Sequence, residues 1–251
     1  MHGKRLYLLD ATAFCYRAFY AVKGLATSSG EPTGAVYGFL NILNKIFKKF
    51  SPEFMAACFD VSRDTFRSRK FAQYKMNRPK MSEELSGQIP LIKEIILAYG
   101  IRIVEKEGLE ADDIIACLAL RSASKLPVTI ISSDKDILQL VCRDIEVFNP
   151  YKEGGIIYDE NRIIEEFGVK PFQIADVLSL MGDSADNIPG IPGIGEKTAL
   201  NLIREFGSVE KIITGLDSIK KDKIRFSIGE NKEKIKLNKE LVMLNFIFSL
   251  F

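Results

Sequence analysis

The stretch "IRIVEKEGLEADDIIACLAL", residues 101–120, joins a β-branched run to an apolar helical run through a short polar turn. Its first four residues predict a strand, and the run after the turn has the length and apolar spacing of a helix. This helix begins with three acids, Glu110, Asp112 and Asp113. Because a strand followed by a helix is the repeating unit of a parallel sheet, the stretch predicts an α/β fold.

The same alternation recurs over the first half of the chain. Strands are predicted at 5–9, 54–59, 101–104, 128–131, 145–148 and 156–158. Apolar spacing predicts helices over 34–50 and 82–100, the second with Ser82 as its N-cap. Beyond the last strand the sequence predicts only helices and turns. We therefore expect a mainly parallel sheet flanked by helices over residues 1–159 and a helical region over residues 160–251.

Composition narrows the classes of protein and of chemistry. A chain of 251 residues that is 47% hydrophobic can bury a large core. No apolar run is long enough for a membrane span, and the N-terminus becomes charged too soon for a signal peptide, so we expect a cytoplasmic protein. The four cysteines form no C-x-x-C pair, which argues against a zinc site or a disulfide framework. The single histidine, His2, is terminal, so acid-base chemistry must use carboxylates, lysines or metal-bound water.

Acids recur where the predicted strands end. Asp10 ends the first strand, Asp60 follows the second, and Asp134 and Asp136 follow "VTII". The carboxyl ends of parallel strands share one edge, so these acids and the Glu110 group should converge there. Each acid alone could be an N-cap, but several at one edge indicate a site. Clustered oxygen ligands without His or Cys favour Mg²⁺ or Mn²⁺ over zinc.

Spacing also predicts which acids share a face. Glu110 and Asp113 lie three residues apart on one side of the predicted helix, while Asp112 lies round its first turn. The helix dipole offsets only ~0.3–1 kcal/mol per charge, too little to hold many carboxylates together without protons or cations. The later stretch "LMGDSADNIPGIPGIGEKTA" adds Asp183 and Asp186, again three apart.

The glycine-rich run "GIPGIGEKT", residues 190–198, is not a nucleotide-binding P-loop, because Glu196 separates the last glycine from Lys197 and no strand precedes it. It predicts a helix-hairpin-helix turn. Gly193 and Gly195 would supply unusual backbone angles and free N–H groups that face a phosphate. Such a turn grips a nucleic-acid backbone without reading sequence, and the alternative is a plain loop.

A basic segment lies between the second strand and the helix at 82–100. Its cations are Arg63, Arg67, Arg69, Lys70, Lys75, Arg78 and Lys80. Phe66, Phe71 and Tyr74 are interleaved with them. Stacking on aromatics combined with phosphate attraction holds single strands, so we favour nucleic-acid contact over a solvated basic face. The basic run at 219–240 extends this footprint or is a solvated helix.

Six motifs together identify a family. They are "LLDATAFCYRAFYA", "FDVSRDTFR", "YKMNRP", "EADD", "SSDKDILQLV" and "MGDSADNIPGIPGIGEKTA". Their order and spacing resemble the 5′ nuclease domain of bacterial DNA polymerase I, within the flap endonuclease superfamily. The resemblance runs from Lys4 to about Leu241. It implies a PIN-like α/β nuclease core with a helical arch at about 61–84, and a DNA-binding region with a helix-three-turn-helix element at about 183–207.

The resemblance implies two Mg²⁺ ions, for which Mn²⁺ can substitute. One ion would be surrounded by Asp10, Asp60, Glu110, Asp112 and Asp113. The other would be held or oriented by Asp134, Asp136, Asp183 and Asp186, with some acids acting through water. Relatives often bind K⁺ through backbone carbonyls at the hairpin turn, so a K⁺ site there is a further expectation.

The resemblance also assigns roles to cations and to the hairpin. Tyr74, Lys75 and Arg78 match residues that contact the scissile region of the strand. Arg17 and Arg67 match phosphate-contacting positions, and Lys70 belongs to the basic segment expected to bind DNA. The hairpin residues expected to grip the duplex are Gly190, Gly193, Gly195, Lys197 and Thr198.

The implied activity is two-metal-ion hydrolysis of DNA by a 5′-3′ exonuclease and 5′-flap endonuclease, giving 5′-phosphate and 3′-hydroxyl products in primer removal and repair. The expected partners are DNA with a 5′ flap, nick or 5′ end, and a DNA polymerase in cis or in trans. We expect a monomer that binds no membrane and works in the bacterial cytoplasm, on the nucleoid.

The sequence departs from the family's pattern at three places, and three other classes of protein remain as alternatives. Ala11 and Ser133 stand where many relatives have glycine, and the apolar end, residues 241–251, lacks any polymerase sequence. A phosphatase of the haloacid dehalogenase class needs Asp two positions beyond the first strand's Asp, where this chain has Thr12. A PIN-type ribonuclease would lack the arch and hairpin, and a catalytically inactive DNA-junction-binding module would have lost acids.

Overall fold

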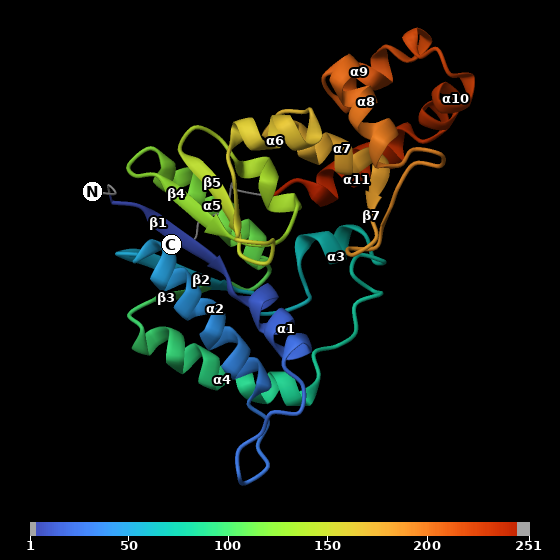
Figure 1. The fold of residues 1–251 in the computed structure, drawn as a ribbon. Coiled ribbons are helices and arrows are strands. Elements are labelled where there is room, and N and C mark those ends of the chain that lie inside the picture. Colours follow the sequence, from blue (N-terminus) through green and yellow to red (C-terminus); the bar gives the residue numbers. More distant parts are fainter. Residues whose placement is uncertain (1–3, 245–251) are drawn as a thin grey trace.

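The computed structural model describes residues 4–244, which excludes most of the apolar end of the chain (Figure 1). Its centre is a six-stranded sheet in the order β3-β2-β1-β4-β5-β6. The strands are β1 (Leu6–Asp10), β2 (Phe54–Phe59), β3 (Arg102–Glu105), β4 (Val128–Ile131), β5 (Ile145–Asn149) and β6 (Ile156–Tyr158). All neighbours pair in parallel except β5 and β6, which confirms the predicted mainly parallel sheet.

Helices cover both faces of this sheet (Figure 1). On one face lie α1 (Ala11–Ala21), α2 (Gly34–Phe50) and α4 (Glu83–Ala98). On the other lie α5 (Ala111–Ala123) and the 3₁₀ helix η1 (Asp136–Leu140). Side chains alternate between the faces, so Leu9 packs under α1 and α2 while Leu8 packs under α5. Ser82 caps α4 as predicted, accepting the Leu85 N–H at 3.2 Å.

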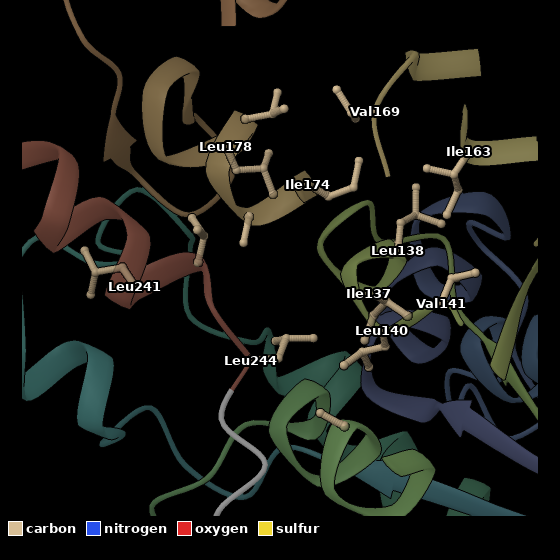
Figure 2. Packing of buried hydrophobic residues seen from close by; sticks show 14 of the residues in the cluster. Ile137, Leu138, Leu140, Val141, Ile163, Val169, Ile174, Leu178, Leu241 and Leu244 are labelled. Carbon is tan, nitrogen blue, oxygen red and sulfur yellow. The ribbon is translucent and has the colours of Figure 1, made fainter. Parts of the chain in front are cut away.

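The second half of the chain is helical and shares the core of the α5 face. Its helices are α6 (Glu160–Phe167), η2 (Pro171–Gln173), α7 (Ile174–Met181), α8 (Glu196–Phe206), α9 (Val209–Thr214), η3 (Leu216–Ser218), α10 (Asp222–Glu230) and α11 (Lys232–Val242). Figure 2 shows Leu138 of η1, Ile174 of α7 and Leu241 of α11 in one apolar cluster. The helical region therefore has a fixed position on the sheet. Among the described residues no helix is long and apolar enough to cross a membrane.

Two short strands interrupt this helical region, although the sequence predicted none there. β7 (Gly182–Asp183) pairs in antiparallel fashion with β8 (Ile188–Pro189). Gly182 has φ +77°, and a Cβ on it would lie 2.3 Å from the Gly190 nitrogen. Only glycine permits this backbone conformation and approach, and two-residue strands are too short to show any periodicity in the sequence.

The predicted helical arch is helical only in part. Between β2 and α4 the structure has one helix, α3 (Phe66–Lys70), followed by turns. Thr65 caps α3, accepting the Ser68 N–H through its hydroxyl. Lys75 then adopts φ +52°, which a continuing helix cannot contain. The segment after α3 runs beside the β7–β8 turn before it returns to α4 (Figure 1).

The packing of α5 against the sheet can be tested directly by substitution. Ile114 is fully buried in α5. We expect Ile114→Ala to lower the free energy of unfolding by about 2–5 kcal/mol, because the truncation leaves a cavity. Leu97→Ala is the control, since Leu97 is 59% exposed on α4, and it should change stability by less than about 0.5 kcal/mol. Denaturant unfolding measures both, and equal effects would contradict this packing.

Candidate active site

Three acids meet where β1, β2 and α5 converge, and we name Asp10, Asp60 and Asp112 the first acidic group. Asp10 is 4% exposed, and its carboxylate accepts the Ser132 hydroxyl at 2.8 Å. Asp60 stands directly after β2 and accepts the Ala111 N–H at 2.8 Å, at the start of α5. Each strand therefore delivers its acid to the carboxyl edge of the sheet, as its position in the sequence predicted.

A second acidic group, Asp134, Asp136, Asp183 and Asp186, lies beside the first. Carboxylate oxygens of Asp136, Asp183 and Asp186 lie within 4.8 Å of one another. Asp134 accepts the Asp136 N–H at 2.9 Å, which ties it to the same cluster. Asp183 ends β7 and Asp186 lies in the turn before β8, so the helical region completes a site that begins on the sheet.

The electrostatics of these acids fit bound cations. Burial raises the pKa of Asp10 to about 7, with Asp60 and Asp134 adding to the rise and the Ser132 hydrogen bond opposing it. Burial also raises the pKa of Asp112, and the neighbouring Asp10 and Asp134 raise it further. Binding of protons or divalent cations therefore stabilises this group of buried carboxylates. A donor set made only of carboxylates suits Mg²⁺ or Mn²⁺.

Glu110 and Asp113 share one face of α5, as predicted, but that face is turned toward α3. Arg67 is 2% exposed, and its guanidinium grips both oxygens of Asp113 at 2.6 and 2.9 Å. It also donates to Glu110 at 2.6 Å and to the Leu241 and Met243 carbonyls. Asp113 therefore contacts Arg67, and Arg67 lies in the interior, which differs from the positions expected round an ion and at a phosphate; both roles stay predictions.

Helix geometry explains this difference. Residues 110 and 113 project from one side of α5, while Asp112 projects about 100° from its neighbour and faces the strand ends. The sequence spacing predicted that Glu110 and Asp113 share one face, but it did not predict that Arg67 contacts this face. Arg67 lies 46 positions before Asp113, on α3, and no local sequence pattern indicates the contact.

Tyr74, Lys75 and Arg78 lie against the acids, and their contact with the scissile strand stays a prediction. The Tyr74 hydroxyl donates to Asp186 at 2.7 Å. The Lys75 ammonium lies 2.5 Å from Glu110 and 3.5 Å from Asp186, and Arg78 also bonds Asp186. Burial opposes the charge on Lys75, but Glu110 and Asp186 outweigh it and raise the Lys75 pKa. Lys75 is therefore protonated at neutral pH.

Two other predicted cations remain at the surface. Arg17 is exposed on α1, with its guanidinium 4.5 Å from the centre of the Tyr151 ring. Lys70 is exposed at the end of α3 and pairs with Glu240. Neither contact ties these cations to the acidic groups, so both side chains are accessible to a ligand.

The hairpin between α7 and α8 has the predicted glycine conformation at one position. Gly193 has φ +77°, whereas Gly195 has ordinary extended angles and serves as the N-cap of α8. Gly190 is needed for a different reason, because a Cβ would lie 2.1 Å from the Met181 carbonyl oxygen. Lys197 is exposed in the first turn of α8, beside the half-buried Thr198.

A cleft of about 360 Å³ lies beside Asp134. Asp134 and Lys135 line it, together with Glu196 at the start of α8 and with Tyr158 and Glu166 from β6 and α6. The cleft therefore reaches one of the predicted site acids and the first residue of α8.

Ser132 is a site residue that the sequence reasoning missed. It is fully buried directly after β4. Its hydroxyl donates to Asp10 and accepts the Asp134 N–H at 3.1 Å, so one side chain orients an acid from each group. The signal available was its position, immediately after a strand and two residues before an acid.

The raised pKa of Asp10 gives a testable pH dependence. The folded pKa of about 7 lies above the unfolded value of about 3.9, so the folded protein holds a proton that the unfolded chain releases. This contribution to stability is complete below the unfolded pKa and is lost as pH rises through about 7. We expect the melting temperature of chelator-treated protein to fall between about pH 4 and pH 7, and Mg²⁺ to restore it most at the higher pH.

Thermal melts across this range, repeated with Asp10→Asn, measure the effect. The variant should show a flatter profile. If the melting temperature of wild type followed the same pH profile as the variant and did not respond to Mg²⁺, repulsion within the acidic cluster would be contradicted.

The role of Arg67 is tested by its loss. We expect Arg67→Ala to lower the free energy of unfolding by about 3–5 kcal/mol, because the truncation leaves Asp113 buried without its partner. Arg69→Ala, on the same helix, removes a solvent-exposed pair with Asp64 and should cost far less. Denaturant unfolding compares the two. Equal stabilities, with only DNA affinity lost in Arg67→Ala, would favour a phosphate contact instead.

The comparisons with known proteins agree with this geometry. Residues 5–168 match the family described as 5′-3′ exonuclease, N-terminal resolvase-like domain, and residues 169–250 match 5′-3′ exonuclease, C-terminal SAM fold. The chain is 43% identical to the 5′-3′ exonuclease of Aquifex aeolicus over 242 residues, covering 96% of this chain and 82% of that protein. It is 42% identical over 246 residues to DNA polymerase I of Bacillus caldotenax, covering 96% of this chain but 28% of the polymerase.

A solved structure also resembles the chain. The flap endonuclease of bacteriophage T5, crystallised with DNA and metal ions, superposes with a TM-score of 0.78 at 25% identity, covering 96% of this chain and 89% of that one. The chain therefore belongs to the 5′-3′ exonuclease family of metal-dependent nucleases.

Proposed function

We propose that this chain is a structure-specific 5′-3′ exonuclease and 5′-flap endonuclease acting on DNA. The observation that carries the proposal is the meeting of two acidic groups with the cations Lys75 and Arg78 at one edge of the sheet. Acids alone could bind a metal for structural reasons. Cations reaching the same carboxylates add the positive charge that phosphoryl transfer requires.

The two acidic groups would hold two divalent ions, Mg²⁺ or Mn²⁺. Asp10, Asp60 and Asp112 would serve one ion, and the second acidic group would serve the other. When bound, such ions lower the pKa of a water and stabilise charge on phosphate oxygens. The T5 enzyme solved with metal ions supports this proposal. The K⁺ ion expected at the hairpin stays a proposal. In the structure, the Gly190 carbonyl accepts a hydrogen bond from the Lys234 ammonium at 3.0 Å.

Lys75, Arg78 and Tyr74 would bind and orient the scissile phosphate. In the structure Lys75 forms an ion pair with Glu110 and Arg78 forms one with Asp186, so both cations lie beside the acids. The Tyr74 hydroxyl donates a hydrogen bond to Asp186, and burial, together with Glu110 and Asp186, raises the Tyr74 pKa, so the hydroxyl remains a donor. Arg17 and Lys70 lie exposed where further phosphates could bind. The expected products carry a 5′ phosphate and a 3′ hydroxyl.

The substrate would be recognised by shape. The duplex would lie on the hairpin, where the N–H groups at the start of α8 and Lys197 face phosphates without reading bases. A 5′ single strand would pass the segment containing α3. The T5 complex with DNA supports nucleic acid as the ligand. We propose DNA with a 5′ flap, nick or 5′ end as substrate, in primer removal and repair.

The setting of the enzyme is also a proposal. The chain spans 28% of the DNA polymerase I that it matches, so a polymerase could act in cis or in trans. We propose a monomer that works in the cytoplasm, on the nucleoid. The domain boundary proposed at residues 159/160 lies close to the point where the two family matches meet.

The decisive experiment is cleavage of a labelled duplex with a 5′ flap, in Mg²⁺ and in chelator, beside an unstructured RNA of equal length. We expect incision near the junction only with metal. Asp112→Asn should lower the rate more than about a hundredfold while flap affinity stays near wild type. Asp217→Asn, which changes an exposed acid in η3, should cut normally.

Each other outcome has a distinct meaning. Tight flap binding without incision in Mg²⁺ or Mn²⁺ would indicate a junction-binding module. Preferred cutting of the RNA would indicate a PIN-type ribonuclease. Near-normal cutting by Asp112→Asn would overturn the metal-site assignment.

A further inference from the structure

The turn that carries Asp183 and Asp186 is joined to the segment that carries Lys75 and Arg78. We name residues 73–78 the arch base and residues 183–187 the acidic turn. The Lys75 N–H donates to the Asp186 carbonyl at 2.9 Å, and the Arg78 side chain donates to the Ala185 carbonyl at 3.1 Å. The arch base thus contacts the backbone of the acidic turn as well as its carboxylates.

Two asparagines join these segments in opposite directions. Asn77, on the arch base, donates its side-chain amide to the Ser184 carbonyl at 2.7 Å. Asn187, on the acidic turn, donates its amide to the Gln73 carbonyl at 2.6 Å. Both bonds end on backbone oxygens, so their effect is to position one chain segment against the other.

The acidic turn depends on this support. Its ends are fixed by the β7–β8 ladder and by the close approach of Gly182 and Gly190. Its tip projects beyond the ladder, and its backbone carbonyls from Ser184 to Asp186 each accept a hydrogen bond from the arch base. Asn187 has φ +57°, a conformation that asparagine adopts more readily than most residues.

We propose that Asn77 and Asn187 are positioning residues that form a reciprocal clasp between the arch base and the acidic turn. The clasp holds Asp183 and Asp186 in one geometry relative to Lys75 and Arg78. This inference rests on the proposed function, because it assigns those four side chains to metal and phosphate binding. Sites of this kind need their groups held within about 0.5 Å, which the packing of exposed turns alone does not provide.

A consequence is thermodynamic coupling. If the clasp ties the two segments, metal binding at the second acidic group and DNA binding at the arch base each favour the same arrangement. Linkage then requires that each raise the affinity for the other by the same factor. Breaking the clasp should weaken this coupling without removing any ligand.

The first test measures Mn²⁺ binding without DNA, by electron paramagnetic resonance. The variants are Asn77→Ala and Asn187→Gly, the second chosen because glycine keeps the positive φ while removing the amide. Asn44→Ala is the matched control, since Asn44 is an exposed asparagine on α2 with one side-chain bond to Tyr99. We expect one of two Mn²⁺ affinities to fall roughly tenfold in both variants, with melting temperatures close to wild type.

The second test measures flap cleavage against Mg²⁺ concentration. Both variants should need roughly tenfold more Mg²⁺ for half-maximal rate and recover most of the rate at saturation, and their KM for DNA should depend less on Mg²⁺ than that of wild type. The double variant should lose little more than either single one, because either loss opens the same clasp. Asn44→Ala should match wild type.

The outcomes separate this inference from the proposed function. Wild-type protein that bound Mn²⁺ and cut flaps, with both variants unchanged, would overturn the clasp alone. A parallel loss of both Mn²⁺ sites and of melting temperature would also overturn it, because the residues would then act only in folding. Wild-type protein without metal-dependent cleavage would overturn the proposed function itself.

Discussion

Several carboxylates lie close together at the carboxyl edge of the sheet, and the positions of the neighbouring cations and segments depend on neutralising their charge. Burial and mutual repulsion raise the pKa values of Asp10, Asp112 and Asp136. Carboxylates this close are stable only with protons or cations beside them. The chain supplies part of that charge itself, through Lys75 and Arg78, and leaves a set of oxygen donors suited to divalent ions.

The same constraint ties the segments of the chain together. Arg67 joins α3 to Glu110 and Asp113 at the start of α5, and to the carbonyls of Leu241 in α11 and Met243 just after it. Because a buried cation without its partners is costly, this one side chain fixes three elements at once. The helical region also shares the apolar cluster of the α5 face, so the acids from both halves of the chain meet on a rigid support (Figure 2).

Much of this arrangement was predictable from local patterns. Apolar runs between helical patterns predicted the strands, and acids at or directly after the strand ends predicted the edge on which Asp10 and Asp60 converge. The contacts that could not be predicted depend on tertiary structure. The pairing of Arg67 with Asp113, the two-residue β7–β8 ladder and the amides of Asn77 and Asn187 leave no periodic signal. The arch helix ends at Phe71, whose backbone is extended, and the positive φ of Lys75 follows further along the segment.

The central claim is that facing acidic groups hold divalent ions at this edge. The most direct measurement is anomalous diffraction from a crystal of the wild-type protein soaked in Mn²⁺. The account predicts one Mn²⁺ peak among Asp136, Asp183 and Asp186, and another among Asp10, Asp60 and Asp112. A fully occupied Mn²⁺ elsewhere with none at either group, or Lys75 and Arg78 still bonded to Asp186 with no peak beside them, would contradict it.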